Sequence, residues 1–184
     1  AQGVRHQGAI LELPPFTYHE SADIYELKPK SRYPFILVLD QIQDPHNLGA
    51  IIRSAVAFEV DAIVIPKDRS ALITSTSLKT SAGLAYRIPI VLIGNLAQFL
   101  NEISKSHFQI LGAEMTGNSH RNVSWEQATA LVMGSESEGL RRLTREKCHE
   151  LIKIDHSSQV ESLNVSVASA IFLHTAYEQR FSNS

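Results

Sequence analysis

The chain has 184 residues, of which 43% are hydrophobic and 20% charged, and its formal net charge is −2. This composition is ordinary for one globular domain, and a nucleic-acid partner would need a local basic patch because the overall charge does not favour one. No apolar run approaches the ~20 residues of a membrane-spanning helix and no signal peptide is evident, while the single cysteine, Cys148, excludes an internal disulfide and suits a reducing cytoplasm.

The first 34 residues have weak periodicity and are interrupted by prolines at 14, 15, 29 and 34. Prolines at such spacing break regular structure, so residues 1–34 are predicted to form a mostly extended lead-in. Its one apolar stretch, "GAILEL", is predicted to form a short strand.

From Phe35 onward, short apolar runs alternate with segments of helical spacing. The runs are "FILVLD", "AIVIP", "PIVLIG", "FQILG", "ALVMG" and "LIKI". The spacing of Leu48, Ile51, Ile52 and Ala55 is typical of an amphipathic helix. Continuous apolar strands between such helices predict an α/β domain over residues 35–184, with a mainly parallel sheet covered by helices on both faces.

Ligands of parallel sheets gather in the loops that follow the carboxyl ends of the strands. The loops to consider here are "QIQDPHN", "SESEG" and "DHSSQVES". Near these strand ends the sequence places five polar side chains that are candidates for chemistry: Asn47, Arg53, Glu136, Ser162 and Asn164.

The usual nucleotide, metal and hydrolase signatures are absent from the sequence. No GxGxxG occurs, and "GSESEGLR" lacks the Lys-Ser/Thr that completes a P-loop. Neither HExxH nor a Cys/His cluster is present, so no metal is expected. "GSES" also differs from the GxSxG nucleophile turn of serine hydrolases.

Three stretches resemble the three motifs of the SpoU/TrmH-type RNA ribose 2′-O-methyltransferases. They are "LDQIQDPHNLGAIIRSA" (39–55, the first motif), "LVMGSESEGL" (131–140, the second motif) and "SLNVSVASAI" (162–171, the third motif). The resemblance covers Phe35 to about Arg180. "IVIPKDRSA" and "GLRRLTREKCHELI" are further similar to members that methylate guanosine in 23S rRNA.

The resemblance implies an α/β fold with a C-terminal trefoil knot and S-adenosylmethionine bound in the knotted loops. It also implies an RNA substrate, with no DNA or membrane partner, and a homodimer formed through the C-terminal helix region. The expected activity is methyl transfer to the ribose 2′-hydroxyl of guanosine in 23S rRNA, which leaves S-adenosylhomocysteine and needs no metal. The alternatives are a tRNA substrate, or a non-catalytic RNA- or ligand-binding module of the same fold.

By the same resemblance the catalytic residues are those of the three motifs: Asn47, Arg53, Glu136, Ser162 and Asn164. The donor-binding positions are Gly134, Ile154 and Leu163. Each catalytic candidate also has a simpler interpretation, since Asn47 and Ser162 suit helix N-caps, Arg53 suits a solvated helix face and Glu136 suits a loop.

The sequence departs from the family pattern in two places. The family usually has Gly after the Glu of the second motif, where this chain has Ser137. Before the third motif the family usually reads Ile-Pro-Met followed shortly by Gly, where this chain has Ile154-Asp155-His156-Ser157-Ser158. Polar groups replace an apolar wall there, so a donor affinity weaker than the family norm is predicted.

Basic side chains form two small groups, Lys28, Lys30 and Arg32, and Arg141, Arg142, Arg145 and Lys147. They offer too few phosphate contacts for tight RNA binding by one chain. The chain begins with Ala1, and "HQGAI" resembles the end of a linker that follows a separate RNA-binding domain in relatives. We therefore expect residues 1–34 to be a linker remnant and an N-terminal RNA-binding domain to precede them in the parent protein.

Overall fold

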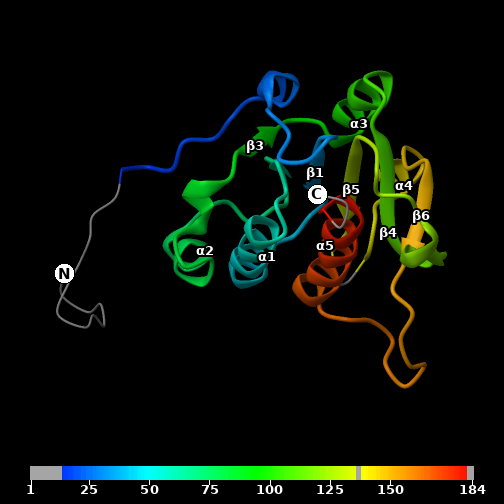
Figure 1. Cartoon of the computed structure of the whole chain (residues 1–184). Coiled ribbons are helices and arrows are strands. Elements are labelled where there is room, and N and C mark those ends of the chain that lie inside the picture. The colour runs from blue at the N-terminus through cyan, green and yellow to red at the C-terminus, as the bar shows by residue number, and fades with distance from the viewer. Residues whose placement is uncertain (1–13, 136–137, 182–184) are drawn as a thin grey trace.

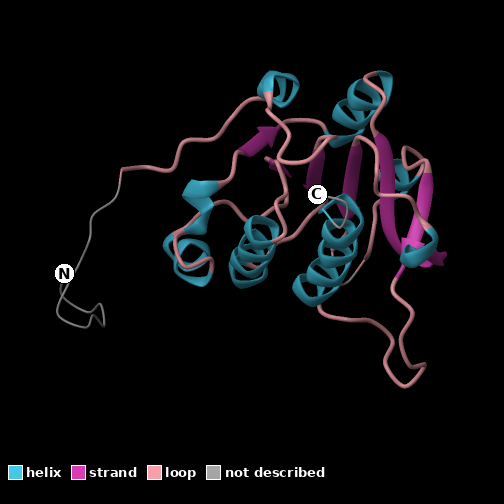
Figure 2. Cartoon of the chain, in the orientation of Figure 1, coloured by secondary structure: helices cyan, strands magenta, loops and turns pink. Residues whose placement is uncertain are grey.

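The computed structural model describes residues 14–135 and 138–181. Its centre is a six-stranded sheet in the order β3-β2-β1-β5-β4-β6, and all of its strand pairs are parallel (Figures 1 and 2). The strands are β1 (Phe35–Leu39), β2 (Ala62–Pro66), β3 (Ile90–Ile93), β4 (Gln109–Ser119), β5 (Thr129–Met133) and β6 (Glu150–Lys153). The predicted parallel α/β fold is confirmed, and each predicted apolar run forms one strand.

Five α-helices and three 3₁₀ helices lie within the described residues. The α-helices are α1 (Pro45–Ala57), α2 (Ser75–Thr80), α3 (Leu96–Lys105), α4 (Arg142–Arg145) and α5 (Val165–Phe181). The 3₁₀ helices are η1 (Ser21–Glu26), η2 (Leu84–Arg87) and η3 (His120–Asn122). No helix among the described residues is long and apolar enough to cross a membrane.

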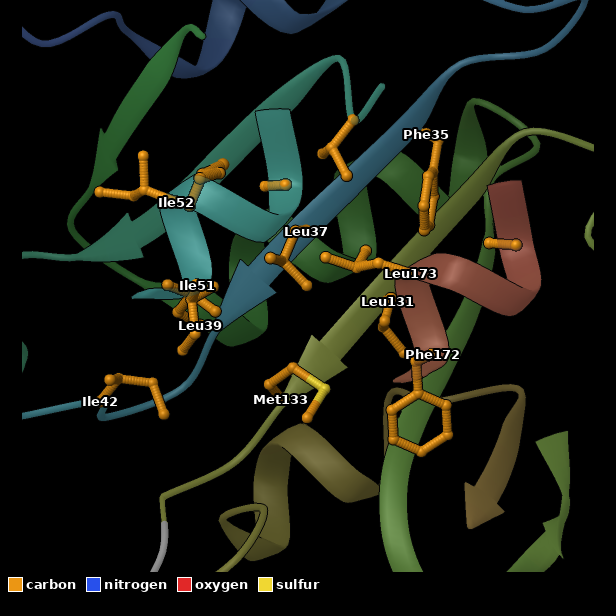
Figure 3. Close-up of a cluster of buried hydrophobic side chains, with 14 of the residues drawn as sticks. Phe35, Leu37, Leu39, Ile42, Ile51, Ile52, Leu131, Met133, Phe172 and Leu173 are labelled. Atoms are coloured by element: carbon orange, nitrogen blue, oxygen red, sulfur yellow. The ribbon is translucent and has the colours of Figure 1, made fainter. Parts of the chain in front are cut away.

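The strands bury side chains on both faces because successive residues of a strand point to opposite sides. In β1, Leu37 and Leu39 pack with residues of α1 and α5, as Figure 3 shows, whereas Ile36 and Val38 pack in a second cluster with α3. Both faces are therefore covered, which explains why the strands read as unbroken apolar runs.

Helix α1 begins immediately after the first strand's polar loop. The Asp44 carboxylate accepts a hydrogen bond from the backbone N–H of His46 at 2.9 Å, and Pro45 occupies the first helical position. Both features favour a helix start. Leu48, Ile51 and Ile52 are then at most 1% exposed, so the apolar stripe of α1 anchors the first motif on the sheet.

The lead-in is less extended than predicted. His19 pairs with Val91 beside β3, and residues 21–26 form η1, whose Ile24 is 4% exposed in the α3 cluster. The few apolar residues of this segment have no regular spacing and give no periodic signal, yet burial of Ile24 and packing of Leu27 hold the segment against the domain. The predicted strand at "GAILEL" lies outside the described residues.

Strand β4 is longer than the run "FQILG" that predicted it. It continues to Ser119, and its pairing with β6 shifts register between Ala113 and Asn118. The continuation carries Glu114 and Met115 to the edge of the sheet where the motifs meet.

Candidate active site

A cavity of about 260 Å³ lies between the ends of β5 and β6, the continuation of β4 and the start of α5. We call it the donor cavity. Among its lining residues are all three predicted donor positions and one predicted catalytic residue: Gly134, Ile154, Leu163 and Ser162. Gly134 belongs to the second motif, Ser162 and Leu163 belong to the third, and Ile154 precedes the third, so folding brings the two motifs to one site although they are well separated in sequence.

Described residues of the second motif on either side of Glu136 and Ser137 pair with each other at this cavity. Ser135 and Gly139 exchange two backbone hydrogen bonds of 3.1 and 2.9 Å. A Cβ atom on Gly134 would lie 2.2 Å from the carbonyl carbon of Gly139, so only glycine permits this approach. Glu136 and Ser137 lie outside the described residues, and the expectations for them remain predictions.

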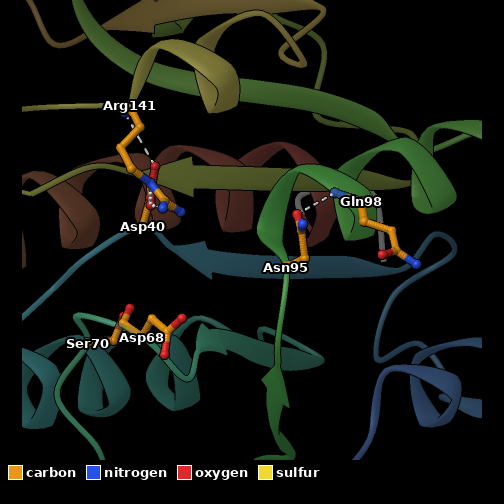
Figure 4. Close-up of polar contacts among 6 residues, drawn as sticks. All are labelled: Asp40, Asp68, Ser70, Asn95, Gln98 and Arg141. Carbon is orange, nitrogen blue, oxygen red and sulfur yellow. Dashed lines mark hydrogen bonds and ion pairs between the residues drawn. The ribbon is translucent and has the colours of Figure 1, made fainter.

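An ion pair with a buried carboxylate joins the residue after the second motif to the end of β1. The carboxylate of Asp40 pairs with the guanidinium of Arg141 (Figure 4). The Asp40 side chain is fully buried and lies 2.7 Å from both Nε and an Nη atom of Arg141. The backbone N–H of Arg141 also donates to Asp40 at 3.3 Å. Because Asp40 precedes the loop that carries the first motif, this pair fixes two motif loops relative to each other.

The first and third motifs meet through two asparagine side chains. Asn164 Nδ2 donates to Asn47 Oδ1 at 3.1 Å. Asn164 Oδ1 accepts from the backbone N–H of Ser166 at 2.9 Å, which makes Asn164 the N-cap of α5. The caps of α1 and α5 are therefore Asp44 and Asn164, so the simpler interpretations of Asn47 and Ser162 as caps are wrong.

Arg53 lies apart from the donor cavity. It is exposed on α1 and does not line the cavity. At ~1.5 Å per residue, it lies about 9 Å from Asn47 along the helix axis. Within the described residues it has no hydrogen bond or ion pair. Its guanidinium is therefore available to a group from outside the chain.

The cavity walls carry charged groups that the sequence did not indicate. Glu114 and Glu138 are acidic lining residues, and Glu114 accepts from an Nη atom of Arg145 at 2.7 Å. Glu114 could not be anticipated because the apolar run of β4 ends at Gly112, before the strand does. No group of three or more His, Cys, Asp or Glu among the described residues is placed to hold a metal ion.

Comparison with known proteins decides the family. The model of the SpoU rRNA Methylase family matches residues 34–174. This chain belongs to the SpoU methylase family. That membership and the parallel sheet confirm the resemblance; the trefoil knot stays an expectation that rests on the family.

Among curated SpoU methylases, the chain is 42% identical over 183 residues to the 23S rRNA (guanosine-2′-O-)-methyltransferase RlmB of Escherichia coli K12. The match covers 98% of this chain and 74% of that protein. The enzyme of the same name from Vibrio vulnificus is 40% identical over 186 residues, covering 100% and 74%.

Solved structures of SpoU methylases share the fold. The AdoMet complex of AviRb from Streptomyces viridochromogenes aligns with a TM-score of 0.79 at 22% identity, over 87% of this chain and 62% of that one. The TrmH/SpoU tRNA modifying enzyme of A. aeolicus aligns with a TM-score of 0.76 at 27% identity, over 89% and 83%. The chain thus spans about three fifths of AviRb.

The donor cavity fits the methyl donor of this family. S-adenosylmethionine combines a flat purine, two ribose hydroxyls and a cationic amino-acid end. Ile154, Leu163 and Phe172 offer apolar surface for the purine, whereas Glu114 and Glu138 suit the ammonium. His156 also lines the cavity, and its buried Nε2 has no hydrogen-bond partner among the described residues.

Proposed function

We propose that this chain transfers a methyl group from S-adenosylmethionine to the ribose 2′-hydroxyl of guanosine in 23S rRNA. The observation that carries the proposal is 42% identity, over 98% of the chain, to an enzyme with that activity in its name. The donor cavity built from the second and third motifs supports it, because it provides the donor with a site beside the polar residues of the transfer site.

When bound, the donor supplies a methyl group on a positively charged sulfur that leaves as a neutral thioether. The chain's part is to hold the ribose in line with that methyl group, and positioning of this kind supplies a large share of a rate enhancement. Leu163, Ile154 and Gly134 hold the donor. Asn47 and Asn164 are braced against each other and present a fixed polar edge at the start of α5.

Arg53 holds the RNA in this proposal. Its planar guanidinium suits bidentate binding of a phosphate, and its charge stabilises the alkoxide that develops on the 2′-oxygen. A guanidinium side chain keeps its proton in proteins, so Arg53 is a poor general base. Ser162 lines the donor cavity next to the transfer site, and Glu136 of the second motif completes the proposed catalytic set.

We propose further that two copies form a homodimer through α5. A groove between α1 and α5 is lined by Ala50 and Ser54 on one side and by Val167, Ala170 and Ile171 on the other. Val167 is 50% exposed there, and Arg53 lies between Ala50 and Ser54 in sequence. A second copy would cover this apolar surface and bring the interface next to the transfer site.

The dimer is tested by sedimentation of Val167→Glu. A buried charge at the interface should convert the dimer to monomers. Val160→Glu is the matched control, because Val160 is equally exposed but does not line the groove. Dimers of unchanged strength in Val167→Glu would exclude this interface.

RNA capture in this proposal needs a part of the parent protein before residue 1. Three of the four basic side chains after the second motif are engaged within the chain: Arg141 with Asp40, Arg142 with Glu146 at 2.6 Å, and Arg145 with Glu114. The relatives extend beyond the matched region, since the chain covers 74% of them. We propose an N-terminal RNA-binding domain, a linker remnant in residues 1–34, and a cytoplasmic location. Mass spectrometry of the protein as it is expressed tests whether an N-terminal domain precedes residue 1.

The substrate is tested by methyl incorporation into unmodified 23S rRNA and into tRNA. The proposal predicts incorporation into the rRNA. The likeness to a tRNA modifying enzyme keeps tRNA as the second candidate, at 27% identity against 42% for the rRNA enzymes. Calorimetric titration with S-adenosylhomocysteine tests the non-catalytic alternative, and absence of heat would support it.

A further inference from the structure

His156 is a polar residue on the wall of the donor cavity, at the position where the family usually has methionine. Its Nε2 is buried and has no hydrogen-bond partner; no other buried side-chain nitrogen or oxygen in residues 14–135 and 138–181 lacks one. Burying a polar atom without a partner costs free energy, so such an atom on a cavity wall indicates a partner supplied by a ligand.

The other ring nitrogen decides what Nε2 can do. His156 Nδ1 lies 3.0 Å from the carbonyl oxygen of Ser157. A carbonyl only accepts, so Nδ1 carries the hydrogen and donates it. In a neutral imidazole the remaining nitrogen is then a bare acceptor. A ligand group that pairs with Nε2 must therefore bring the hydrogen-bond donor.

Contacts with β4 hold the chain just before His156 in place. Asp155 accepts a hydrogen bond from Ser119 Oγ at 2.5 Å, and His120 Nδ1 lies 3.0 Å from the carbonyl oxygen of Lys153. The Ser119–Lys153 register of β4 and β6 adds backbone pairing at the same point. These contacts restrict the segment before any ligand arrives, which lowers the entropy lost when His156 engages one.

The chemistry of the donor narrows the choice of group. The ammonium of the amino-acid end suits the carboxylates of Glu114 and Glu138, which line the same cavity. Its remaining hydrogen-bond donors are neutral and belong to the nucleoside: the exocyclic amine of adenine and the two ribose hydroxyls. A neutral imidazole nitrogen suits such groups.

We propose that His156 Nε2 accepts a hydrogen bond from the nucleoside of S-adenosylmethionine, from the adenine amine or a ribose hydroxyl, and so sets the specificity of the cavity for the intact nucleoside. The proposal rests on the proposed function, because it assumes that the donor cavity binds this molecule. It gives a role to Asp155 and His156, where the sequence departs from the family pattern: Asp155 anchors the loop and His156 contacts the ligand.

Calorimetric titration of the full chain with S-adenosylhomocysteine tests the proposal through two matched variants. His156→Gln places an amide near the position of Nε2, whereas His156→Asn places one near Nδ1 and leaves the Nε2 position empty. One neutral hydrogen bond corresponds to roughly tenfold in affinity, so His156→Asn should bind about tenfold more weakly than wild type and His156→Gln within about threefold.

Analogues of S-adenosylhomocysteine that lack the amine, or one ribose hydroxyl, identify the partner. The analogue that lacks the contacted group should bind wild type about tenfold more weakly than S-adenosylhomocysteine does. The His156→Asn protein should bind this analogue and S-adenosylhomocysteine with equal affinity. Equal affinities of wild type and His156→Asn, or equal losses in both variants, would overturn the role of His156 and leave the proposed function intact. No binding of S-adenosylhomocysteine to wild type would overturn the proposed function itself.

Discussion

The side-chain amide of Asn164 contacts two helices at once. Its oxygen caps α5 through the backbone N–H of Ser166, and its nitrogen donates to Asn47 near the start of α1. A helix that opens with Asn-Val-Ser-Val has weak intrinsic helix formers at its start. The cap offsets this weakness, because it satisfies backbone donors that a helix start otherwise leaves without partners.

Asn164→Ala should lower the free energy of unfolding by about 1 kcal/mol, because it removes the cap. Asn164→Asp keeps an acceptor at the cap and loses the N–H that Asn47 receives. We expect the Asn164→Asp protein to unfold in urea like wild type but to transfer methyl groups more slowly. Equal destabilisation by the two substitutions would show that the cap is not the stabilising contact.

Arg53→Lys should reduce methyl transfer by about 10²-fold, since an ammonium cannot reproduce a bidentate guanidinium contact with phosphate and developing alkoxide. Affinity for S-adenosylhomocysteine should stay at the wild-type value, because Arg53 does not line the donor cavity. The measurements are single-turnover kinetics and calorimetry. Near-full turnover in Arg53→Lys would exclude the bidentate role.

At the scale of elements, the Asp40–Arg141 pair connects the end of β1 to the loop after β5. Asp40 is fully buried, whereas the Arg141 side chain is 41% exposed. The backbone of Asp40 also donates to the carbonyl of Met133 at 2.7 Å. Two neighbouring strands and the polar loops that follow them are thus fixed together beneath the proposed site.

Arg141→Ala should destabilise the domain by about 3 kcal/mol, because it leaves the buried Asp40 carboxylate without its partner. Arg142→Ala is the matched control: Arg142 is 78% exposed and pairs with Glu146 on the surface, where such a pair contributes less than about 1 kcal/mol. Urea unfolding measures both. Equal effects of the two substitutions would contradict the assignment of Asp40 and Arg141 as a stabilising pair.

The predictable elements are those whose burial pattern is local. Strands β1, β2 and β5 are runs of mainly apolar residues buried on both faces, and α1 has Asp44-Pro45 before an apolar stripe, so the sequence indicates these elements. The register shift in β4 depends on its pairing with β6, far along the chain, and leaves no local signal. Glu114 on the cavity wall was missed for that reason.

In the candidate site, the sequence predicted only residues that belong to the family motifs or lie next to them. Gly134, Ile154, Leu163 and Ser162 meet at one cavity, and Asn47 meets Asn164, as three motifs at strand ends lead one to expect. The unpartnered Nε2 of His156 follows from burial and from the Ser157 carbonyl, which are properties of the folded loop. The sequence indicated only that His156 replaces an apolar residue.

For the molecule as a whole, Cys148 reports the integrity of the fold. Burial raises the pKa of its thiol to about 12, and the nearby carboxylates of Asp40 and Glu114 contribute in the same direction. The reactive form of cysteine is the thiolate, whose population near neutral pH is therefore very small. Iodoacetamide should modify Cys148 slowly in the native protein and at the ordinary rate in urea. Equally rapid modification in both would contradict this burial.

The molecule places its three motifs at one edge of the sheet, with the donor cavity between β4, β5, β6 and α5 and with Arg53 on α1. Methyl donor and ribose are thus held by different parts of the chain in the proposed reaction. In the proposed reaction, this separation of the donor site from the ribose site directs the methyl group to the ribose 2′-hydroxyl and not to the nucleobase.

Nucleoside analysis of the product tests the proposed reaction most directly. Unmodified 23S rRNA is incubated with the protein and S-adenosylmethionine, digested to nucleosides and examined by mass spectrometry, with the Arg53→Ala protein as the control. We expect 2′-O-methylguanosine with wild type and a strong loss of it with Arg53→Ala. Methylation of a base, or no methylated nucleoside at all from wild type, would contradict the proposed reaction.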